Sequence, residues 1–221
     1  MYNFSKRLID IIFSLVALVL LLPFFIPIVV LLKLTGEGEV FYFQERIGIN
    51  NSTFQIWKFA TMLKNSMNMG TGSITLKSDP RVTKVGSILR KTKVNELPQI
   101  INVLLGDLSL VGPRPLVRET FEAYNKEIQL KIYNIKPGLT GIGSIIFRDE
   151  ETLISSAKGQ NPHLFYKKVL APYKAKLEIW YQDNRGFLLD LKLIFLTAWV
   201  IIFPKSNLYY KILKDLPKNE F

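Results

Sequence analysis

The chain has no cysteine among its 221 residues and only one histidine, His163, to which we assign no role. The lack of cysteine excludes a disulfide scaffold, a thiolate zinc site and a cysteine nucleophile, and it fits a reducing compartment. A phosphate loop of the form Gly-x-x-x-x-Gly-Lys is also absent, and Gly70–Gly72 is too short to count as one.

Acidic residues are comparatively scarce. The chain holds 29 Lys and Arg against 18 Asp and Glu, for a formal net charge of +11. This balance favours an anionic partner, which could be nucleic acid, acidic lipid or a phosphorylated small molecule. Because 48% of the residues are hydrophobic, the chain can bury a sizeable core and is not mainly disordered.

The longest uncharged segment, residues 11–32, is strongly apolar. As a helix rising about 1.5 Å per residue it would be about 33 Å long, enough for the hydrocarbon core of a bilayer. Pro23 and Pro27 complicate this interpretation, because a proline inside a helix removes a hydrogen-bond donor and bends the helix. The part before Pro23 would reach only partway across.

Charges at both ends of this segment bear on its topology. Lys6 and Arg7 precede it and Lys33 follows it, and cationic flanks prefer the cytoplasmic side of a membrane. We therefore expect a re-entrant helical hairpin, bent at Pro23, with both ends on one side. A spanning helix is the alternative, and a cleaved signal peptide is disfavoured because no small-x-small site follows the segment.

A second apolar segment, residues 187–203, lies near the C-terminus and is interrupted by Asp190 and Lys192. The part after Lys192 is too short to span a bilayer. It fits either a buried core helix or a helix at the membrane surface, where Trp199 is a residue type that is enriched.

Short elements of both kinds are expected between the two apolar ends. β-Branched and aromatic residues predict strands at 40–43 and 53–59, separated by a turn at 48–51. Helix caps or helical periodicity mark four further segments: 87–93 with a cap at Ser87, 95–105 with a cap at Asn95, 116–133 and 165–182. Residues 65–73 are expected to form a loop, and residues 136–143 a turn.

One group of residues could carry chemistry. Asn95 and Glu96 stand where a helix is expected to begin, so unpaired N–H groups and the helix dipole would face a bound anion. Arg90 lies just upstream, and Arg114 stands between two prolines in Gly112–Pro115, a stiff backbone that would present its guanidinium at little entropic cost. Together they would bind a phosphate or diphosphate, with Glu96 holding a divalent cation or acting as a base. Taken singly, each could instead be a helix cap, a dipole partner or a loop residue.

A series of short motifs follows one order along most of the chain. They are Pro23 in the apolar segment, Gln44–Gly48 (QERIG), Trp57–Met62 (WKFATM), Asp79–Arg81 (DPR), Asn95–Gln99 (NELPQ), Asn102–Leu104 (NVL), Gly106–Ser109 (GDLS), Gly112–Pro115 (GPRP), Lys136–Gly141 (KPGLTG) and Leu189–Lys192 (LDLK). In this order they resemble the bacterial sugar transferase family, the monotopic polyprenyl-phosphate phosphoglycosyl transferases. So many motifs in one order make the resemblance specific.

The resemblance implies an enzyme on the cytoplasmic face of the bacterial inner membrane, anchored monotopically by a re-entrant helix bent at Pro23. Such enzymes transfer a sugar phosphate from a nucleoside diphosphate sugar, usually a UDP-sugar, to polyprenyl phosphate. They release UMP and start the membrane steps of surface glycan assembly. They use Mg²⁺ and an Asp-Glu pair, whose aspartate attacks the β-phosphate to give a covalent phosphosugar.

Site residues follow from the same resemblance. The Asp-Glu pair falls at Asn95 and Glu96, with Glu96 as the metal-holding carboxylate. Four cations are implied as phosphate- or substrate-binding residues: Arg90, Arg114, Lys58 and Arg81. The implied partners are a nucleoside diphosphate sugar, polyprenyl phosphate and membrane lipid. No motif supports nucleic-acid binding, and the sequence leaves the sugar, the glycan pathway and the oligomeric state open, with an oligomer possible.

Three positions depart from the family pattern. Asn95 stands where the family has its nucleophilic aspartate, and an uncharged amide is a poor nucleophile and a weaker Mg²⁺ ligand than a carboxylate. Ala60 replaces an arginine, and Leu22 replaces a serine that precedes the membrane proline.

Three accounts fit the asparagine. Lipid phosphate could attack the sugar nucleotide directly, with Glu96 or another carboxylate as base; the protein could be a non-catalytic membrane-bound scaffold; or the residue could be an inactivating change. We favour direct attack, because polyprenyl phosphate is already an anionic nucleophile.

The expected fold is therefore α with minor β. Residues 1–34 would form the re-entrant membrane helix, and residues 35–221 a compact cytosolic domain of helices around a small sheet. Interfacial amphipathic helices would hold the active site at the height of the lipid headgroups.

Overall fold

The computed structural model describes residues 2–157 and 161–218. It is mostly helical with two small sheets, which confirms the expected α fold with minor β. The elements run in this order: α1 (Tyr2–Leu34), β1 (Phe41–Ile47), η1 (Ile49–Asn51), β2 (Thr53–Phe59), η2 (Ser66–Asn68), α2 (Lys84–Lys91), η3 (Val94–Glu96), α3 (Gln99–Leu105), β3 (Ser109–Val111), α4 (Arg118–Phe121), α5 (Lys126–Lys131), β4 (Gly138–Thr140), α6 (Ile142–Ile146), α7 (Glu150–Ser156), α8 (Pro162–Phe165), η4 (Tyr166–Leu170), α9 (Ala171–Asn184), α10 (Phe187–Ile202) and α11 (Leu208–Ile212).

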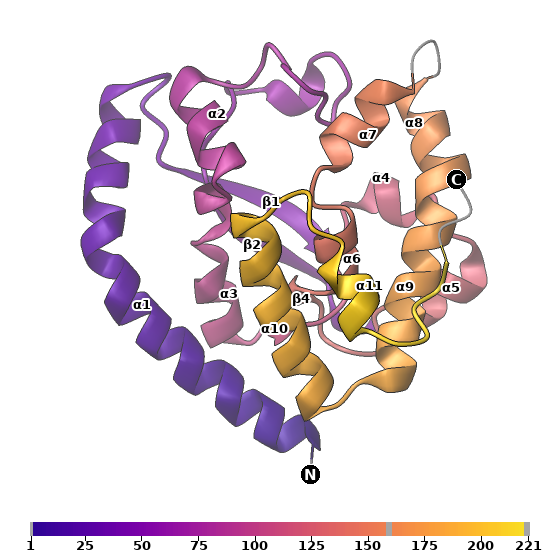
Figure 1. Cartoon of the computed structure of the whole chain (residues 1–221). Helices are drawn as coiled ribbons and strands as arrows, with labels where there is room; N and C mark the ends of the chain where they lie inside the picture. Colours follow the sequence, from indigo (N-terminus) through magenta and orange to yellow (C-terminus); the bar gives the residue numbers. More distant parts are fainter. Residues whose placement is uncertain (1, 158–160, 219–221) are drawn as a thin grey trace.

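Helix α1 is one continuous helix that changes direction partway along its length (Figure 1). The expected hairpin of two arms is therefore not confirmed. Pro23 and Pro27 lie inside the helix, and prolines are the usual cause of such a bend. In the part of the chain that the structure describes, α1 is the one helix long and apolar enough to cross a membrane, judged by length and composition, and few of its side chains are buried.

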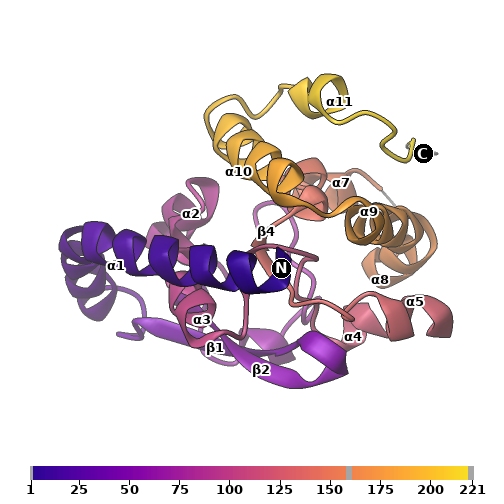
Figure 2. The same cartoon turned by 90° about the horizontal axis from the view of Figure 1, so that it is seen from below.

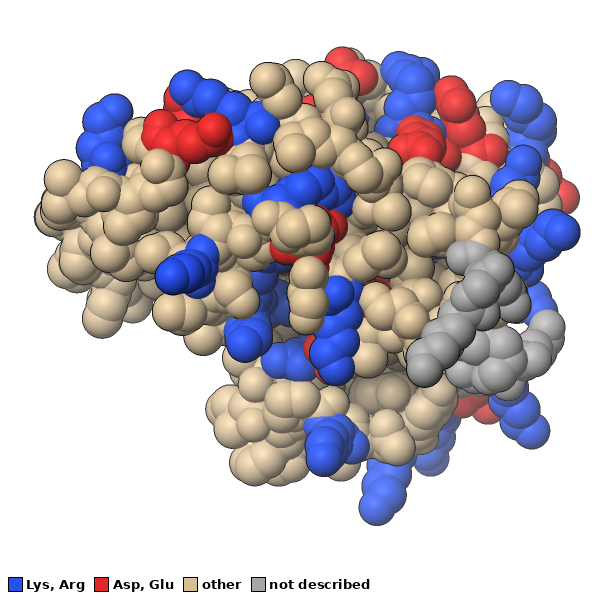
Figure 3. Space-filling model, turned by 90° about the horizontal axis from the view of Figure 1, so that it is seen from above, with Lys and Arg blue, Asp and Glu red and all other residues tan. Residues whose placement is uncertain are grey.

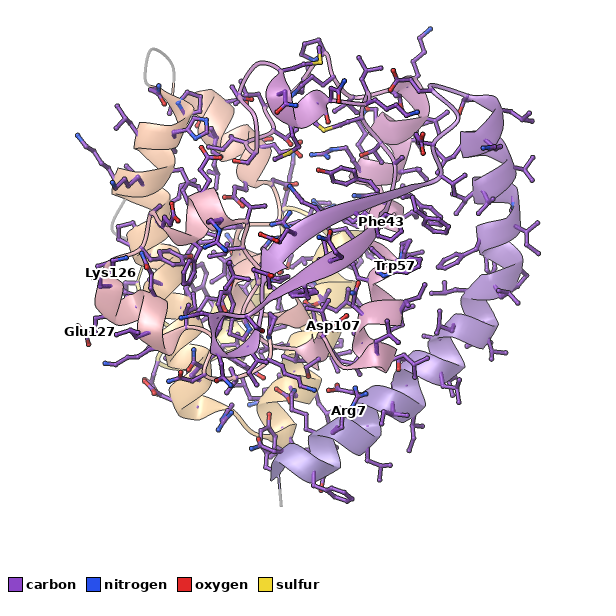
Figure 4. All side chains as sticks on the ribbon, turned by 180° about the vertical axis from the view of Figure 1, so that it is seen from behind. Arg7, Phe43, Trp57, Asp107, Lys126 and Glu127 are labelled. Atoms are coloured by element: carbon purple, nitrogen blue, oxygen red, sulfur yellow. The ribbon has the colours of Figure 1, made fainter. Side chains whose placement is uncertain are left out.

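Both ends of α1 contact the rest of the molecule. Near its N-terminus, Arg7 donates hydrogen bonds to the carbonyl oxygens of Val103 and Leu104 at 2.7 and 2.8 Å, at the end of α3 (Figure 4). Toward its C-terminus, Leu32 is buried in a cluster with Phe59 of β2. Most of the exposed apolar side chains of α1 lie between these two contacts, and Phe4 and Leu34 lie just outside them.

Strands β1 and β2 form an antiparallel hairpin in which Phe41 pairs with Phe59. This confirms the two predicted strands and their turn, although β1 extends four residues beyond its predicted end, to Ile47. Phe43 and Trp57 lie side by side on it, with ring centroids 4.7 Å apart (Figure 4). The hairpin and α10 lie on opposite sides of the molecule, with α3 and β4 between them (Figure 2).

A second sheet, not expected from the sequence, pairs β3 with β4 in parallel. Part of it lies within residues 136–143, where only a turn was predicted. The two backbones approach so closely that a Cβ atom at Gly138 would lie 2.1 Å from the backbone nitrogen of Gly112. Each strand has three residues, too few for a recognisable alternation of side chains.

The predicted helix caps at Ser87 and Asn95 are wrong. Helix α2 is capped by Thr83, whose hydroxyl accepts a hydrogen bond from the backbone nitrogen of Gly86 at 2.9 Å, and Ser87 lies inside the helix. Lys93 then adopts a left-handed conformation (φ 60°, ψ 10°), and the chain makes the 3₁₀ turn η3 before α3 begins. Asn95 therefore lies within a tight turn.

Two other helix predictions are confirmed only in part. The segment 116–133 forms two short helices, α4 and α5, and Asn125 caps the second by accepting a hydrogen bond from the backbone nitrogen of Ile128 at 2.8 Å. The segment 165–182 contains the π-helical turn η4, which leads directly into α9.

Helix α10 is buried on one side and exposed on the other. Leu193 and Leu196 are fully buried in the main core, whereas Leu188 and Phe195 are 73% and 51% exposed. The prediction of a buried core helix therefore describes one side of α10. An apolar exposed side is what a helix at the membrane surface would need.

Candidate active site

The predicted site residues surround a cavity of about 1930 Å³, bounded by parts of α1, the β1–β2 hairpin, α2, α3, α7 and α10. Five of the predicted residues line it: Lys58, Arg90, Asn95, Glu96 and Arg114. These five residues come from four separate parts of the chain. The fold brings their side chains to one cavity, as the sequence suggested. The sixth, Arg81, does not line the cavity.

Glu96 is at the centre of the charged residues. Its Oε1 atom lies 3.4 Å from Nη2 of Arg114 and 3.6 Å from Nζ of Lys58. Burial alone would raise the pKa of Glu96, but the positive charges of Arg114, Lys58 and Lys93 outweigh it and hold the pKa well below its usual range. Glu96 is therefore a carboxylate at neutral pH, and it lies beside two basic side chains.

The backbone of Arg114 is held by residues outside its own loop. Its N–H donates to Oε1 of Glu178 at 3.2 Å, and its carbonyl oxygen accepts from the Tyr133 hydroxyl at 2.7 Å. Its side chain reaches Glu96 and, through Nη1, the Ser144 hydroxyl at 3.3 Å. Glu96 is the main cause of the raised pKa of Arg114, so this guanidinium stays charged.

Lys58 extends from β2 toward the same carboxylate. Burial lowers the pKa of Lys58 to about 7; nearby Arg46 and Arg114 lower it further, while Glu96 opposes the shift. The lysine is therefore only partly protonated at neutral pH. An anion that enters the cavity would favour its charged form.

Asn95 is nearly buried, and its Oδ1 atom has no hydrogen-bond partner among the described residues. This oxygen and the Glu96 carboxylate belong to adjacent residues that line one cavity. Mg²⁺ that also binds substrate phosphates typically uses one or two carboxylates and other oxygens of the protein. This pair of oxygen donors fits such an ion, although the described residues form no cluster of three or more Asp, Glu, His or Cys side chains.

Arg90 and Arg81 have different surroundings. Arg90 forms an ion pair with Glu151 of α7 at the cavity wall. Arg81 is 3% exposed, pairs with Asp79 at 2.7 Å and donates further hydrogen bonds to four backbone carbonyl groups between residues 66 and 74. The geometry gives Arg81 the role of holding this loop, so the prediction that it binds substrate is not supported.

Several charged residues of the site were not singled out from the sequence. Arg46, Arg148 and Lys174 also line the cavity, together with Glu150 and Glu151. Arg46 belongs to one of the family motifs, so a sequence signal existed for it. Lys174 bonds to Glu150 at 2.9 Å across the fold, and no local pattern marks either residue.

Lys and Arg side chains are prominent on the face drawn in Figure 3. Figure 3 shows Lys and Arg side chains gathered around a hollow in this face, with acidic side chains among them. A hollow with an excess of cations attracts anionic ligands and raises their local concentration.

Comparisons with known proteins agree with this geometry. The sequence profile described as "Bacterial sugar transferase" matches residues 1–204. The chain is 32% identical over 217 residues to the exopolysaccharide production protein ExoY of Sinorhizobium fredii (92% of this chain, 88% of that protein). It is 38% identical over 203 residues to the UDP-glucose:undecaprenyl-phosphate glucose-1-phosphate transferase of Klebsiella pneumoniae (91% and 41%).

A third relative, the UDP-N-acetylgalactosamine-undecaprenyl-phosphate N-acetylgalactosaminephosphotransferase of Aeromonas hydrophila, is 39% identical over 147 residues. That alignment covers 66% of this chain and 34% of the relative. The chain thus spans less than half of the Klebsiella and Aeromonas relatives, and most of ExoY. The relatives from Klebsiella and Aeromonas are named as transferases of a sugar phosphate to undecaprenyl phosphate. Given the profile match over residues 1–204, the chain belongs to the bacterial sugar transferase family.

Proposed function

We propose that this protein transfers a sugar 1-phosphate from a nucleoside diphosphate sugar, most simply a UDP-sugar, to polyprenyl phosphate. The observation that carries the proposal is the Glu96 carboxylate with Arg114 and Lys58 beside it in one cavity. Guanidinium and ammonium groups held in place by a carboxylate are suited to binding a diphosphate and neutralising its charge during transfer.

The proposed reaction is a direct displacement. An oxygen of the lipid phosphate attacks the β-phosphorus of the nucleotide sugar. The bond between that phosphorus and the oxygen bridging it to the α-phosphorus breaks, and UMP leaves with the bridging oxygen. The products are UMP and a polyprenyl diphosphate sugar, and the reaction needs no further reactant.

Each residue would contribute through charge or position. Arg114 and Lys58 would neutralise phosphate oxygens, and Glu96 would keep both cations aligned before the substrate arrives. Glu96 and Oδ1 of Asn95 are the atoms that would hold Mg²⁺, which would supply further neutralisation of the diphosphate. The amide of Asn95 cannot act as the covalent nucleophile of the family, and this supports attack by the lipid phosphate itself.

The apolar side of the cavity supports a lipid acceptor. Phe13 and Leu21 of α1 and Leu191 and Ile194 of α10 line the same cavity as Glu96. A polyprenyl chain is apolar along its whole length, whereas its phosphate is anionic. A cavity with an apolar wall and a cationic region matches both parts of that substrate.

We also propose that α1 lies in the bacterial inner membrane with both ends on the cytoplasmic face. The contacts of Arg7 and Leu32 with the same globular part support this topology. Because the chain has no cysteine, single cysteines placed at Phe4 and Leu34, which are 79% and 80% exposed, can be labelled specifically. Both should react with an impermeant reagent from the cytoplasmic side; reaction from opposite sides would contradict the topology.

Turnover is tested by UMP release. The full chain would be incubated with Mg²⁺ and UDP-glucose, UDP-galactose or UDP-N-acetylgalactosamine, with and without polyprenyl phosphate. We expect UMP to form with one of these donors and only when the lipid is present. A phosphosugar adduct on the protein in the absence of lipid would contradict direct displacement.

Asn95 also supports a second candidate function, a membrane-bound scaffold that binds a sugar nucleotide without turnover. Binding of UDP without UMP release under every condition would favour it. Replacement of Asn95 by aspartate separates the two functions: a large gain in turnover would mark an inactive site in the present chain, and little change or a loss would favour the direct mechanism.

A further inference from the structure

Glu178 of α9 is a buried carboxyl group outside the predicted site. Glu178 is 2% exposed, and its carboxyl group contacts the backbone of Arg114. Its Oε1 atom accepts the Arg114 N–H at 3.2 Å, whereas Oε2 is buried with no hydrogen-bond partner in the described part of the chain. A buried carboxyl group with so few partners is costly, and burial raises the pKa of Glu178 to about 7.

The space for this carboxyl group depends on a glycine. A Cβ atom added at Gly143 of α6 would lie 2.2 Å from Oε1 of Glu178. The carboxyl group therefore lies between the backbone of α6 and the backbone of Arg114. The next residue of α6, Ser144, bonds to the Arg114 guanidinium. Helix α6 thus contacts both the group that holds the Arg114 backbone and the Arg114 side chain itself.

The other side of Arg114 is held in a matching way. The Tyr133 hydroxyl donates to the Arg114 carbonyl oxygen at 2.7 Å and accepts the Leu116 N–H at 2.9 Å. Both backbone polar groups of Arg114 are thus bonded to buried side chains. Since Pro113 and Pro115 have no N–H, the Arg114 N–H is the hydrogen-bond donor at the centre of this loop.

We propose that Glu178 is a positioning residue: it fixes the Arg114 backbone so that the guanidinium reaches Glu96 and the substrate phosphates. The proposal rests on the proposed function for its effect on turnover, because it assumes that Arg114 binds the diphosphate. The hydrogen bond itself does not depend on that assumption. A merely space-filling role would require no acceptor, and an apolar side chain of similar size would occupy the site at lower cost.

Three variants distinguish the loss of the hydrogen-bond acceptor at residue 178 from a change in packing. Glu178→Gln keeps an acceptor oxygen without the charge, and Glu178→Leu removes the acceptor. Gln182→Met is the matched control: Gln182 lies one turn further along α9 and donates to the Ile132 carbonyl oxygen at 2.8 Å. No hydrogen bond joins it to Arg114 among the described residues. The Gln182→Met variant therefore loses a comparable hydrogen bond between a side chain of α9 and the backbone of another segment.

Hydrogen exchange tests the contact without any assay of function. The segment from Gly112 to Leu116 has three backbone amides, because two of its residues are proline. In the full chain, Glu178→Leu should speed amide exchange in this segment, whereas Glu178→Gln and Gln182→Met should leave it close to wild type. Unchanged exchange in Glu178→Leu would overturn the proposal, whether or not the protein is a transferase.

Kinetics then test the consequence for the site. Glu178→Leu should lower kcat/KM on the order of 10- to 100-fold at temperatures well below its melting point, as expected for a displaced catalytic group, and Glu178→Gln should restore most of it. In an Arg114→Ala background, Glu178→Leu should have almost no further effect, because its action passes through Arg114. An equal loss in both backgrounds would overturn the positioning role.

The two proposals fail in different ways. If wild-type protein releases no UMP from any donor, the proposed function fails, and UDP binding by the same variants replaces kinetics as the readout. Weaker UDP binding in Glu178→Leu than in Gln182→Met would then support the positioning role. Equal UDP binding in these two variants would overturn it.

Discussion

Arg81 and Arg114 are two arginines in family motifs, each beside a carboxylate, yet their surroundings differ. The Arg81–Asp79 side chains are both 4% exposed, and Arg81 donates hydrogen bonds to Asp79 and to loop carbonyl groups. The Arg114 side chain is 32% exposed and pairs with Glu96 at 3.4 Å. A guanidinium whose donors are all used by the protein has little left for a ligand, so the number of internal partners separates a structural arginine from a binding one.

The largest expected effect falls on stability. Arg81→Ala should lower the free energy of unfolding by about 3–5 kcal/mol, because it leaves the Asp79 carboxylate buried and unpaired. Chemical denaturation measures this loss. Arg81→Lys should recover only part of it, since an ammonium group cannot reproduce the planar array of donors. A stable Arg81→Ala protein that has lost only substrate binding would reverse the assignment of Arg81.

Arg114→Ala should show the opposite pattern. We expect kcat/KM to fall on the order of 10²- to 10³-fold, because a group that neutralises the transferred phosphate is lost. The free energy of unfolding should change by less than about 1 kcal/mol, as for a partly exposed ion pair. UMP release measures kcat/KM, and chemical denaturation measures the free energy of unfolding. The control is Arg118→Ala, because Arg118 is an exposed arginine four residues away.

Lys58 should make UDP binding depend on pH near neutrality. Its pKa is about 7 in the free protein, and a phosphate favours its protonated form, so affinity should fall as the pH rises through 7. Between pH 6 and pH 8 the wild type should lose about tenfold more affinity than Lys58→Arg, whose guanidinium stays charged. Parallel pH profiles would show that Lys58 does not contact the phosphate.

Lys58 should also affect stability, with the opposite dependence on pH. Its pKa is lower in the folded protein than in the unfolded chain, so the unfolded chain binds more protons between about pH 7 and pH 10. The contribution of Lys58 to the free energy of unfolding therefore rises with pH across this range. Lys58→Met should flatten that rise in denaturation experiments; an unchanged slope would contradict the lowered pKa.

The smallest effect is expected at the ion pair of Arg90 with Glu151. The Glu151 side chain is 45% exposed, so Glu151→Gln should change the free energy of unfolding by less than about 1 kcal/mol. It should strengthen UDP binding by about twofold to threefold, because an opposing carboxylate no longer competes for Arg90. Calorimetric titration with UDP checks this, and weaker binding would mean that Glu151 itself helps to hold the nucleotide.

Sequence patterns predicted the parts of this molecule whose structure depends on residues close together in the sequence. The β1–β2 hairpin followed from β-branched and aromatic residues on both sides of a turn, and the long apolar helix from its length. The proximity of Glu96 and Arg114 followed from the phosphate site expected of these residue types. The break at Lys93 was missed, because a left-handed residue other than glycine leaves no strong signal. The cap at Asn95 was wrong for that reason.

Long-range partners were beyond prediction. Glu178 lies 64 residues from Arg114 in the sequence, and Glu150 reaches Lys174 from another helix. No periodicity or motif connects such pairs, since only the packing of α6, α7 and α9 brings them together. The two three-residue strands of the second sheet could likewise not be predicted from either segment alone, because each is a strand only through its pairing with the other.

The most direct test of the central claim follows the β-phosphate of the donor. A UDP-sugar labelled with ³²P at this position would be incubated with the full chain, Mg²⁺ and polyprenyl phosphate, and the label would be measured in the extracted lipid. We predict lipid labelling by the wild type and a loss on the order of 10²-fold or more in Glu96→Gln. Equal labelling by Glu96→Gln, or label that stays in the nucleotide with every donor tested, would contradict the account.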